Sequence, residues 1–597
     1  MKGSLAARSR SGRLLFPAYA ALTVYFTAPL LVTGHQLGIQ DWDVLLLYHA
    51  AVLKSVYEYG VLPFWNPWYC GGNVLWQNPQ VALLSPTYLF TLITSLPFAM
   101  KLNIFIHYLL GFAGMHILLT RALRLSYWPA VLFLGSVFVL AGGMVMHLAV
   151  GHATFLPYFY LPWLLFFFLQ ALTTGRLRYV VAAGALVAVA IYNGGIHMSF
   201  MAGMGLACFA GAASLVRRDW RPLAMLAGVG ILAFLFAAPK LLPVQAFVGN
   251  PRTIDTRNPP ARDAMSAEMV MRAFLDPFQF RRLRVNGQGA DWHEYGNYIG
   301  SAAALAIVAS FLWILWRRPW QRERWVEAAL AATALGLFLL GLGEFGALAP
   351  FEIVQQLPVA SRFRLPSRYL LVFVLFAVAM IAAVLRDVPV ERLGEGKRFV
   401  TIVLVLATAS LAYWNHIQFE GVFHMPPLQS SFSFLARPEQ PVVDATTPGW
   451  GGDRDSPMLR AMMQNRAVLF CYEPFVLPGG VDPSRAMIFP EDDVRLEDIE
   501  FAPGRIGFRA LSPGGGRVFL NQRYVEGWHS DAGDFTVHPD NGLAYVSLPA
   551  GAAGRFTFWY APPGLFSGIL LCAAGIGLSA AAWRRTLGPA ELGRSNA

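Results

Sequence analysis

The sequence predicts an α-helical polytopic membrane protein of about twelve transmembrane helices, with a small extracytoplasmic β-rich domain before the last helix. Three observations support this fold class: the composition, the spacing of the apolar runs and the position of the basic residues between them. Of the 597 residues, 56% are hydrophobic and only 14% are charged, and the mean hydropathy is +0.47. A soluble chain of this length would form several domains of about 150 residues and would carry more charge. Most of the chain is therefore expected to lie in lipid.

Apolar runs long enough to cross a membrane recur along the chain. A spanning helix requires about 20 predominantly apolar residues. Such runs lie near residues 14–33, 102–120, 127–148, 154–174, 178–194, 196–216, 222–243, 297–316, 325–343, 366–386, 399–418 and 562–583. The apolar segment 81–97 is short and bounded by Pro86 and Pro97, which favours a re-entrant or interfacial piece. The first run is long for a signal peptide and has no evident small-residue cleavage site, so an uncleaved first helix is expected.

The net charge of +11 predicts a topology and not a nucleic-acid partner, because Lys and Arg form short clusters between the apolar runs. These clusters lie near 121–124, 176–178, 217–221, 317–324, 386–398 and 584–585. With the N-terminus in the cytoplasm, all of them fall on the cytoplasmic side, as the positive-inside rule requires. Counting 81–97 as a span would place them outside. We therefore expect a multi-pass protein of the inner (plasma) membrane with both termini cytoplasmic. The segments expected outside are 34–101, 244–296, 344–365 and 419–561.

The last outer segment carries the pattern of β-strands. The runs 505–511, 517–525, 543–548 and 555–560 alternate apolar and polar residues, and Pro- and Gly-rich turns separate them. A small β-sandwich-like module is predicted. The expected domains are a transmembrane domain over 1–418, the extracytoplasmic β-rich domain over 419–561, and the final helix with a cytoplasmic tail over 562–597.

The four cysteines share no C-x-x-C spacing, so neither a zinc site nor a dithiol redox motif is indicated. Cys70 and Cys471 are expected outside, where a disulfide can persist, whereas Cys208 and Cys572 are expected in lipid. Two interpretations of the outer pair stay open. They form a bridge between the first outer loop and the β-rich domain, or they are unpaired packing residues.

Polar residues that can carry chemistry gather in the outer segments. Asp41 and Asp43 stand just beyond the first helix, where water meets lipid. They are either catalytic acids, or they are solvated loop acids or a helix N-cap for the stretch from Val44. An aromatic loop rich in Pro and Gly follows over 63–79, as an ordered shelf at the headgroup level or an aromatic belt. His147 and His152 flank an outer turn and His293 precedes Glu294. These histidines are either part of a His/Glu metal site or scattered polar side chains.

Several short motifs follow one another through the outer segments. They are an acid after the first helix, Gly60-x-x-Pro63-x-Trp65-Asn66-Pro67 with Gly71-Gly72, Glu294-x-x-x-Tyr298-x-Gly300, Phe363-Arg364-x-Pro366-x-Arg368, Tyr524-x-x-Gly527-Trp528, Leu548-Pro-Ala-Gly551 and Tyr560-Ala-Pro-Pro563. In this order they resemble the bacterial YfhO-type membrane protein family, which belongs to the GT-C glycosyltransferase superfamily. The resemblance spans nearly the whole chain. One departure is the doubled first acid, Asp41 and Asp43, which leaves open which of the two matches the family's carboxylate.

The resemblance implies a GT-C-like fold and the transfer of a sugar from a polyprenyl-phosphate carrier to an outer-face acceptor, with inversion at the anomeric carbon. The implied partners are the polyprenyl-phosphate-linked sugar, an envelope glycopolymer, glycolipid or protein acceptor, and membrane lipids. An acceptor hydroxyl is a weak nucleophile and needs a carboxylate as general base, whereas the lipid phosphate is already an acidic leaving group. Asp41 or Asp43 is then the base. Glu294 orients the acceptor or holds a divalent cation.

The donor phosphate needs cations on the outer face. Arg362 and Arg364 lie in the loop 344–365 and Arg368 about one turn into the next helix, so all three are expected at the headgroup boundary. They suit a phosphate because Arg makes planar bidentate contacts with phosphate oxygens. Lys240 lies at the outer end of its helix and is a further candidate. The alternative for all four is snorkelling to ordinary headgroups. The side chains expected to line the substrate loop are those of Trp65, Asn66, Gln77 and Asn78.

Two other classes of function compete with an enzyme. A lipid or polysaccharide transporter or flippase would place ionisable groups near the bilayer midplane and would contain broken helices in symmetric halves. Neither is evident in the sequence, since most acids lie in loops. A non-catalytic envelope scaffold would bind polysaccharide through its β-rich domain, and it would tolerate the loss of Asp41 and Asp43.

Overall fold

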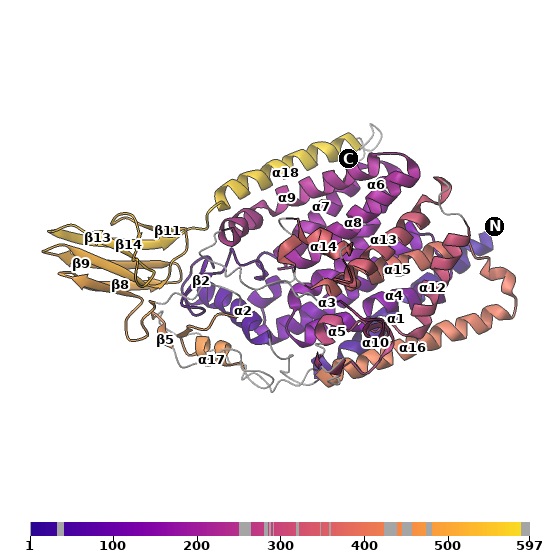
Figure 1. Cartoon of the computed structure of the whole chain (residues 1–597), viewed down its shortest axis with the longest axis horizontal. Coiled ribbons are helices and arrows are strands. Elements are labelled where there is room, and N and C mark those ends of the chain that lie inside the picture. The colour runs from indigo at the N-terminus through magenta and orange to yellow at the C-terminus, as the bar shows by residue number, and fades with distance from the viewer. Residues whose placement is uncertain are drawn as a thin grey trace.

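The computed structural model is a helical bundle that carries a β-sandwich at one end (Figure 1). It describes residues 2–32, 41–86, 88–249, 264–279, 284–285, 288–289, 292–317, 322–346, 348–357, 360–363, 365–422, 439–444, 456–472 and 480–586. The first helix α1 (Lys2–Val32) begins, and the last helix α18 (Leu565–Thr586) ends, at the side of the bundle away from the sandwich. This arrangement agrees with the expectation that the chain termini and the sandwich lie on opposite sides of a membrane.

Each apolar run of the sequence coincides with a helix or with two consecutive helices. Besides α1 and α18, these are α3 (Leu96–Ile117) with η2 (Leu118–Ala122), α4 (Trp128–Val139) with α5 (Gly142–Ala149), η3 (Ala153–Tyr160) with α6 (Leu161–Thr174), α7 (Leu177–Tyr192), α8 (Ile196–Arg217), α9 (Arg221–Val248), α12 (Ser301–Trp316), α13 (Trp325–Gly341), α15 (Tyr369–Leu385) and α16 (Gly396–Val422).

By length and composition, seven helical stretches of the described residues can cross a membrane. They are Leu96–Ala122, Trp128–Ala149, Ala153–Thr174, Ile196–Arg217, Arg221–Val248, Pro366–Leu385 and Gly396–Phe419. The apolar parts of α1, α7, α12, α13 and α18 are shorter, with 10–17 residues each. The structure therefore gives seven candidate spans, and the five further spans of the expected twelve stay predictions.

The last helix connects the sandwich to the bundle. α18 runs from the sandwich along the upper edge of the bundle in Figure 1 and packs along α9. The approach is close because α18 presents glycine here: a Cβ added to Gly568 would lie 2.5 Å from the carbonyl oxygen of Ala238. Small residues of this kind let helix backbones come together where burial of apolar surface offers no driving force, as in lipid.

The described part of the first outer loop, from residue 41 on, is largely buried. It contains α2 (Trp42–Tyr57), a hairpin of β1 (Trp65–Asn66) and β2 (Asn73–Val74), and the short η1 (Tyr88–Leu92). Nearly every side chain of α2 is buried. The apolar segment 81–97 forms no spanning helix in its described residues, as its length and prolines predict.

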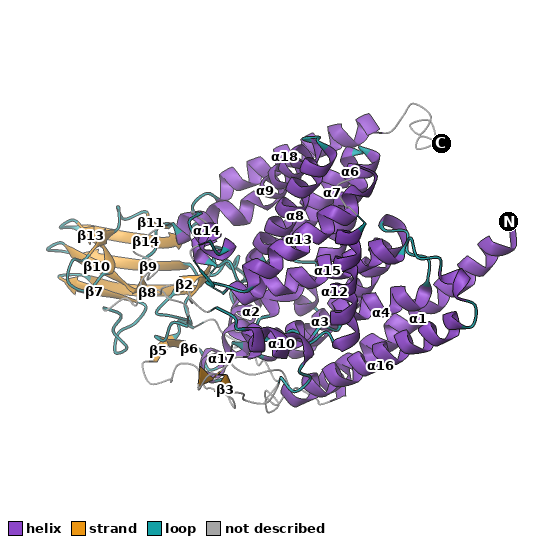
Figure 2. Cartoon of the chain, turned by 45° about the vertical axis from the view of Figure 1, so that its right-hand side comes forward, coloured by secondary structure: helices purple, strands orange, loops and turns teal. Residues whose placement is uncertain are grey.

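The sandwich consists of two four-stranded antiparallel sheets, ordered β12-β13-β10-β7 and β11-β14-β9-β8 (Figure 2). The strands are β7 (Ile488–Asp492), β8 (Arg495–Ala502), β9 (Arg505–Ser512), β10 (Gly516–Arg523), β11 (Trp528–Ser530), β12 (Thr536–Val537), β13 (Leu543–Leu548) and β14 (Ala552–Tyr560). Phe508 and Phe558 of one sheet share a core with Val518 and Val546 of the other. The four predicted strands are confirmed as β9, β10, β13 and β14. The sequence did not predict β8, because its mostly exposed residues do not alternate between buried and exposed positions.

A small unit before the sandwich covers the first outer loop. It consists of the parallel strands β5 (Val442–Asp444) and β6 (Arg466–Val468), with α17 (Pro457–Met463) between them. α17 packs on α2, and the unit forms no part of either sandwich sheet. The outer segment expected as one β-rich domain therefore contains two different structures.

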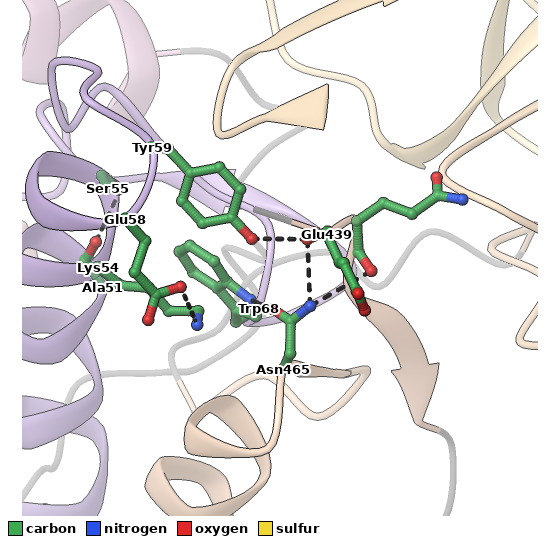
Figure 3. A network of polar contacts seen from close by, with 9 residues as sticks. Ala51, Lys54, Ser55, Glu58, Tyr59, Trp68, Glu439 and Asn465 are labelled. Atoms are coloured by element: carbon green, nitrogen blue, oxygen red, sulfur yellow. Dashed lines mark hydrogen bonds and ion pairs between the residues drawn. The ribbon is translucent and has the colours of Figure 1, made fainter. Parts of the chain in front are cut away.

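Cys70 and Cys471 form a disulfide with a Cα separation of 4.6 Å, which decides between the two interpretations of the pair. Backbone hydrogen bonds accompany the bridge, since Val468 donates to the Trp68 carbonyl at 2.9 Å. Nearby, the Tyr59 hydroxyl and the Asn465 amide donate to the carbonyl oxygen of Glu439 at 2.6 and 3.1 Å (Figure 3). The bridge thus lies in a continuous interface between the first outer loop and the unit of β5, α17 and β6.

Candidate active site

A tight turn between α5 and η3 holds the start of α2. The backbone N–H of Asp41 donates to the Val150 carbonyl at 2.9 Å, and the Trp42 indole N–H donates to the Leu148 carbonyl at 2.7 Å. Gly151 has a φ of +92°, and a Cβ there would collide with the backbone nitrogen of Trp42. Glycine is required at this position both by the left-handed backbone and by the close approach. The next residue in the turn is His152.

The turn places Asp41 against two histidines. Asp41 Oδ2 lies 3.1 Å from His152 Nε2, and His152 Nδ1 lies 2.8 Å from His147 Nδ1. The Asp41 side chain is 16% exposed, so solvent and a ligand can reach it. Asp41 stands at the N-cap position of α2, but its side chain makes no capping hydrogen bond there. Its carboxylate is directed to the histidines instead.

Glu294 and Arg368 form a bidentate pair. Arg368 Nε donates to Glu294 Oε2 at 2.7 Å and Arg368 Nη2 donates to Oε1 at 2.6 Å. Glu294 lies in α11 (Trp292–Tyr295) and Arg368 ends η6 (Pro366–Arg368), and these two short helices are in contact. Burial alone would raise the pKa of Glu294, but the charge and hydrogen bonds of Arg368 outweigh it and hold the pKa well below the ordinary value. Glu294 is therefore an ionised partner of Arg368.

Phe155 joins these two groups into one cluster. Its ring stacks on His147 at 4.3 Å and on His152 at 5.6 Å between centroids, and the Arg368 guanidinium lies 5.1 Å from its centre. The His152 and His293 rings are 5.8 Å apart, edge to face. We refer to this set as the acidic cluster. Its members are Asp41, His147, His152, His293, Glu294 and Arg368.

Tyr472 reaches the same place from the outer unit. Its backbone N–H donates to the Tyr69 hydroxyl at 2.6 Å, and it directly follows the disulfide-bonded Cys471. Burial, followed by the charge of Asp41 and a hydrogen bond to it, raises the pKa of the Tyr472 phenol far above its ordinary value. The phenol thus stays neutral beside the Asp41 carboxylate.

Asp43 faces away from the acidic cluster. Its carboxylate accepts hydrogen bonds from the backbone N–H groups of Met458 and Leu459 at 3.1 and 2.9 Å, at the start of α17. Only 1% of Asp43 is exposed, and burial raises its pKa to about 6, although the two backbone hydrogen bonds oppose that rise. The expected helix N-cap lies at the start of α2, where Asp41 occupies the position without a capping side-chain hydrogen bond. Asp43 instead accepts from the first turn of α17.

Lys240 is occupied by the protein itself. It is fully buried, and its ammonium group donates to the carbonyl oxygens of Trp76, Asn78 and Val81 at 2.6, 2.8 and 3.2 Å. An ammonium has three donors, and all three are used. Lys240 ties the first outer loop to α9, and we do not retain it as a phosphate ligand.

The four expected substrate-loop side chains are buried in structural contacts. The Trp65 indole donates to Gln522 and the Tyr560 hydroxyl donates to Gln77, so these two residues join the loop to the sandwich. Asn66 and Asn78 accept hydrogen bonds from backbone N–H groups within the loop. We propose no binding role for these four residues.

The side chains of the other two predicted phosphate ligands, Arg362 and Arg364, are not described by the structure. Arg364 lies outside the described residues. Arg362 ends η5 (Ala360–Arg362), but its side chain is not among those described.

Within the described residues, no group of three or more His, Cys, Asp or Glu side chains is suited to hold a metal ion. The sequence did not predict that His147 and His152 lie beside Asp41. The available signal was their position on either side of an outer turn.

Comparison with known proteins gives likeness at the level of structure only. No protein-family model matches the sequence, and no curated protein matches it. A solved structure of the arabinofuranosyltransferase AftD from Mycobacteria is similar with a TM-score of 0.43 and 16% identity, over 78% of this chain and 32% of that chain. A mutant form of the same enzyme gives a TM-score of 0.35 and 15% identity, over 67% of this chain and 27% of that chain. This chain thus spans about a third of the length of that enzyme.

Proposed function

We propose that this chain is a membrane glycosyltransferase. It moves a sugar from a polyprenyl-phosphate carrier to a hydroxyl of an outer-face glycopolymer, glycolipid or protein. The observation that carries the proposal is the acidic cluster. It links a partly exposed carboxylate, Asp41, to a guanidinium, Arg368, through two rings. His152 contacts Asp41, and both His152 and Arg368 lie against Phe155. The carboxylate and the guanidinium are the base and the phosphate ligand that such a transfer needs. The motifs that resemble the YfhO-type family contribute Glu294 and Arg368 to the same cluster.

Asp41 is the general base in this proposal. The acceptor oxygen attacks the anomeric carbon from the face opposite the phosphate, its proton passes to the Asp41 carboxylate, and the phosphate leaves with the electrons of the broken C–O bond. The single displacement inverts the anomeric centre. Asp43 is unsuited to this role, because both of its oxygens accept backbone hydrogen bonds and its side chain is closed to solvent.

Arg368 binds the departing phosphate. A guanidinium has five N–H donors, and two of them are used by Glu294. The remaining three can contact phosphate oxygens while the Glu294 pair holds the plane of the group. Ionised Glu294 thereby orients Arg368.

The test compares envelope glycans of cells with and without the gene by mass spectrometry, and then restores the gene as Asp41→Asn or Asp43→Asn. We expect deletion to remove the mass of one sugar from a glycopolymer or glycolipid. Asp41→Asn should slow transfer by about 100- to 10,000-fold, because it keeps the shape of the side chain and removes its basicity. Asp43→Asn should restore transfer.

The protein level in the membrane is measured for both variants as a control on insertion. Normal glycans with Asp41→Asn at normal protein level would exclude Asp41 as the base and would favour the scaffold function. Accumulation of unchanged glycolipid on the inner face in the deletion strain would favour the flippase function.

A further inference from the structure

The proposed mechanism assigns no role to His147 and His152, the two histidines next to Asp41. His147 and His152 come from opposite ends of one turn, and their Nδ1 atoms are 2.8 Å apart. We propose that His152 is a positioning residue that holds the Asp41 carboxylate in its reactive orientation, and that His147 fixes the tautomer of His152. This inference rests on the proposed function, since it assigns the histidines to the same site.

The hydrogen-bond geometry permits a single arrangement of protons when both rings are neutral. A carboxylate only accepts hydrogen bonds, so His152 must carry its proton on Nε2, 3.1 Å from Asp41 Oδ2. Its Nδ1 then has a lone pair, and the proton between the two Nδ1 atoms belongs to His147. Without His147, His152 could carry its proton on Nδ1 and would present a lone pair to the carboxylate. That arrangement is repulsive.

Packing keeps the His152 ring in place. The ring stacks on Phe155, and the backbone N–H of His152 donates to the His147 carbonyl at 2.9 Å. His147 is buried and stacks on the same phenyl ring. A ring held in this way loses little conformational entropy when it forms a hydrogen bond, so the contact with Asp41 is preorganised.

The consequence for Asp41 is a carboxylate with restricted rotation. His152 fixes Oδ2, so the carboxylate cannot rotate freely about its last bond. A carboxylate has about four lone-pair sites. It can therefore accept from His152, from Tyr472 and from the acceptor hydroxyl together. His152 never takes the proton of the acceptor. It acts on the reaction only through the orientation of Asp41.

Kinetic variants separate this positioning role from simple packing. His152→Gln places an amide N–H close to the position of Nε2, whereas His152→Ala removes the donor. With the polyprenyl-phosphate sugar identified by the glycan comparison, His152→Ala should lower kcat by about 10- to 100-fold with the KM for donor little changed. His152→Gln should keep kcat within about threefold of wild type. His529→Gln, an exposed histidine of the sandwich, is the matched control.

A spectroscopic measurement tests the hydrogen bond without any transfer assay. In ¹⁵N-histidine-labelled protein in lipid, the His152 signal, identified by its loss in His152→Gln, should report the Nε2–H tautomer. It should become a mixture of tautomers in His147→Ala and return to Nε2–H in His147→Asn, whose amide can donate to His152 Nδ1.

The two readouts fail independently. An Nδ1–H tautomer of His152 in the wild-type protein overturns the inference, and so does equal loss of kcat in His152→Gln and His152→Ala. A wild-type protein with no transfer activity and the Nε2–H tautomer would contradict the proposed function and leave the hydrogen bond standing.

Discussion

At the scale of single residues, Asp41 and Asp43 are separated by one residue, yet their carboxylates contact different parts of the protein. Trp42 between them is fully buried and anchors the start of α2, so the two carboxylates leave the backbone in different directions. Successive positions on a helix differ by about 100°, and residues two apart therefore diverge widely. One acid reaches the turn with the histidines and the other reaches the start of α17.

The buried Asp43 predicts a pH dependence of stability. Its pKa is raised from the usual 3.8 to about 6, so the folded protein binds more protons than the unfolded chain between these values. The contribution of Asp43 to the free energy of unfolding should therefore be largest below about pH 4 and fall by up to about 3 kcal/mol as pH rises to about 6. Thermal unfolding in lipid nanodiscs between pH 4 and 7.5 measures this slope. Asp43→Asn should flatten it, and an unchanged slope in that variant would assign the effect to another group.

At the scale of elements, the outer unit of β5, α17 and β6 is attached to the first outer loop by contacts of three kinds. Asp43 caps α17, Val468 pairs with the backbone of Trp68, and Cys70 is bonded to Cys471. The bridge joins residues 401 positions apart. It lies one residue before Tyr472, which contacts Asp41. The stability of this interface and the geometry of the acidic cluster are therefore coupled.

Loss of the bridge should destabilise the outer loops. A cross-link across so long a loop restricts the unfolded chain strongly, and removing a native disulfide typically costs about 2 to 5 kcal/mol. Cys70→Ser should lower the unfolding temperature of the outer region and should make residues between 439 and 472 more sensitive to protease. Cys208→Ser and Cys572→Ser are matched controls, because these two thiols are free. Identical protease patterns for Cys70→Ser and the controls would show that the disulfide does not stabilise the outer region.

At the scale of the whole molecule, the sandwich and the chain termini mark opposite ends of the bundle (Figure 1). The acidic cluster lies where α2, α5 and α11 meet, and the first outer loop of this region is bonded to the sandwich through Trp65 and Gln77. A carrier held in the membrane with its phosphate at the headgroup level would reach this end of the bundle.

This arrangement predicts the membrane topology. Reporter fusions at residues 220 and 320 should report the cytoplasm, because the positive-inside rule places basic loops there. A fusion at residue 480 should report the outside, because the sandwich lies at the other end of the bundle. Dual reporters that are active on only one side of the membrane measure this directly. A cytoplasmic signal at residue 480 would reverse the assignment and place the acidic cluster on the inner side.

Much of the helical architecture is readable from sequence, since a backbone in lipid must satisfy its own hydrogen bonds and an apolar run therefore becomes a helix. The strands β9, β10, β13 and β14 were readable because each alternates between core and solvent. The exposed β8 and the short β11 and β12 carry too little alternation to be found. The parallel pair β5 and β6 depends on a partner more than twenty residues away, which local patterning does not reveal.

The sequence by itself determined the apolar runs, the basic loops between them and the set of polar residues in the loops expected outside, because these depend on the chemistry of each residue and its near neighbours. Only the tertiary structure decided which of them meet. Asp41 joins His152 across a glycine turn, Glu294 joins Arg368 from a distant helix, and Lys240 turns inward to three carbonyls. Side-chain direction depends on packing between segments far apart in the chain, and no local pattern encodes it.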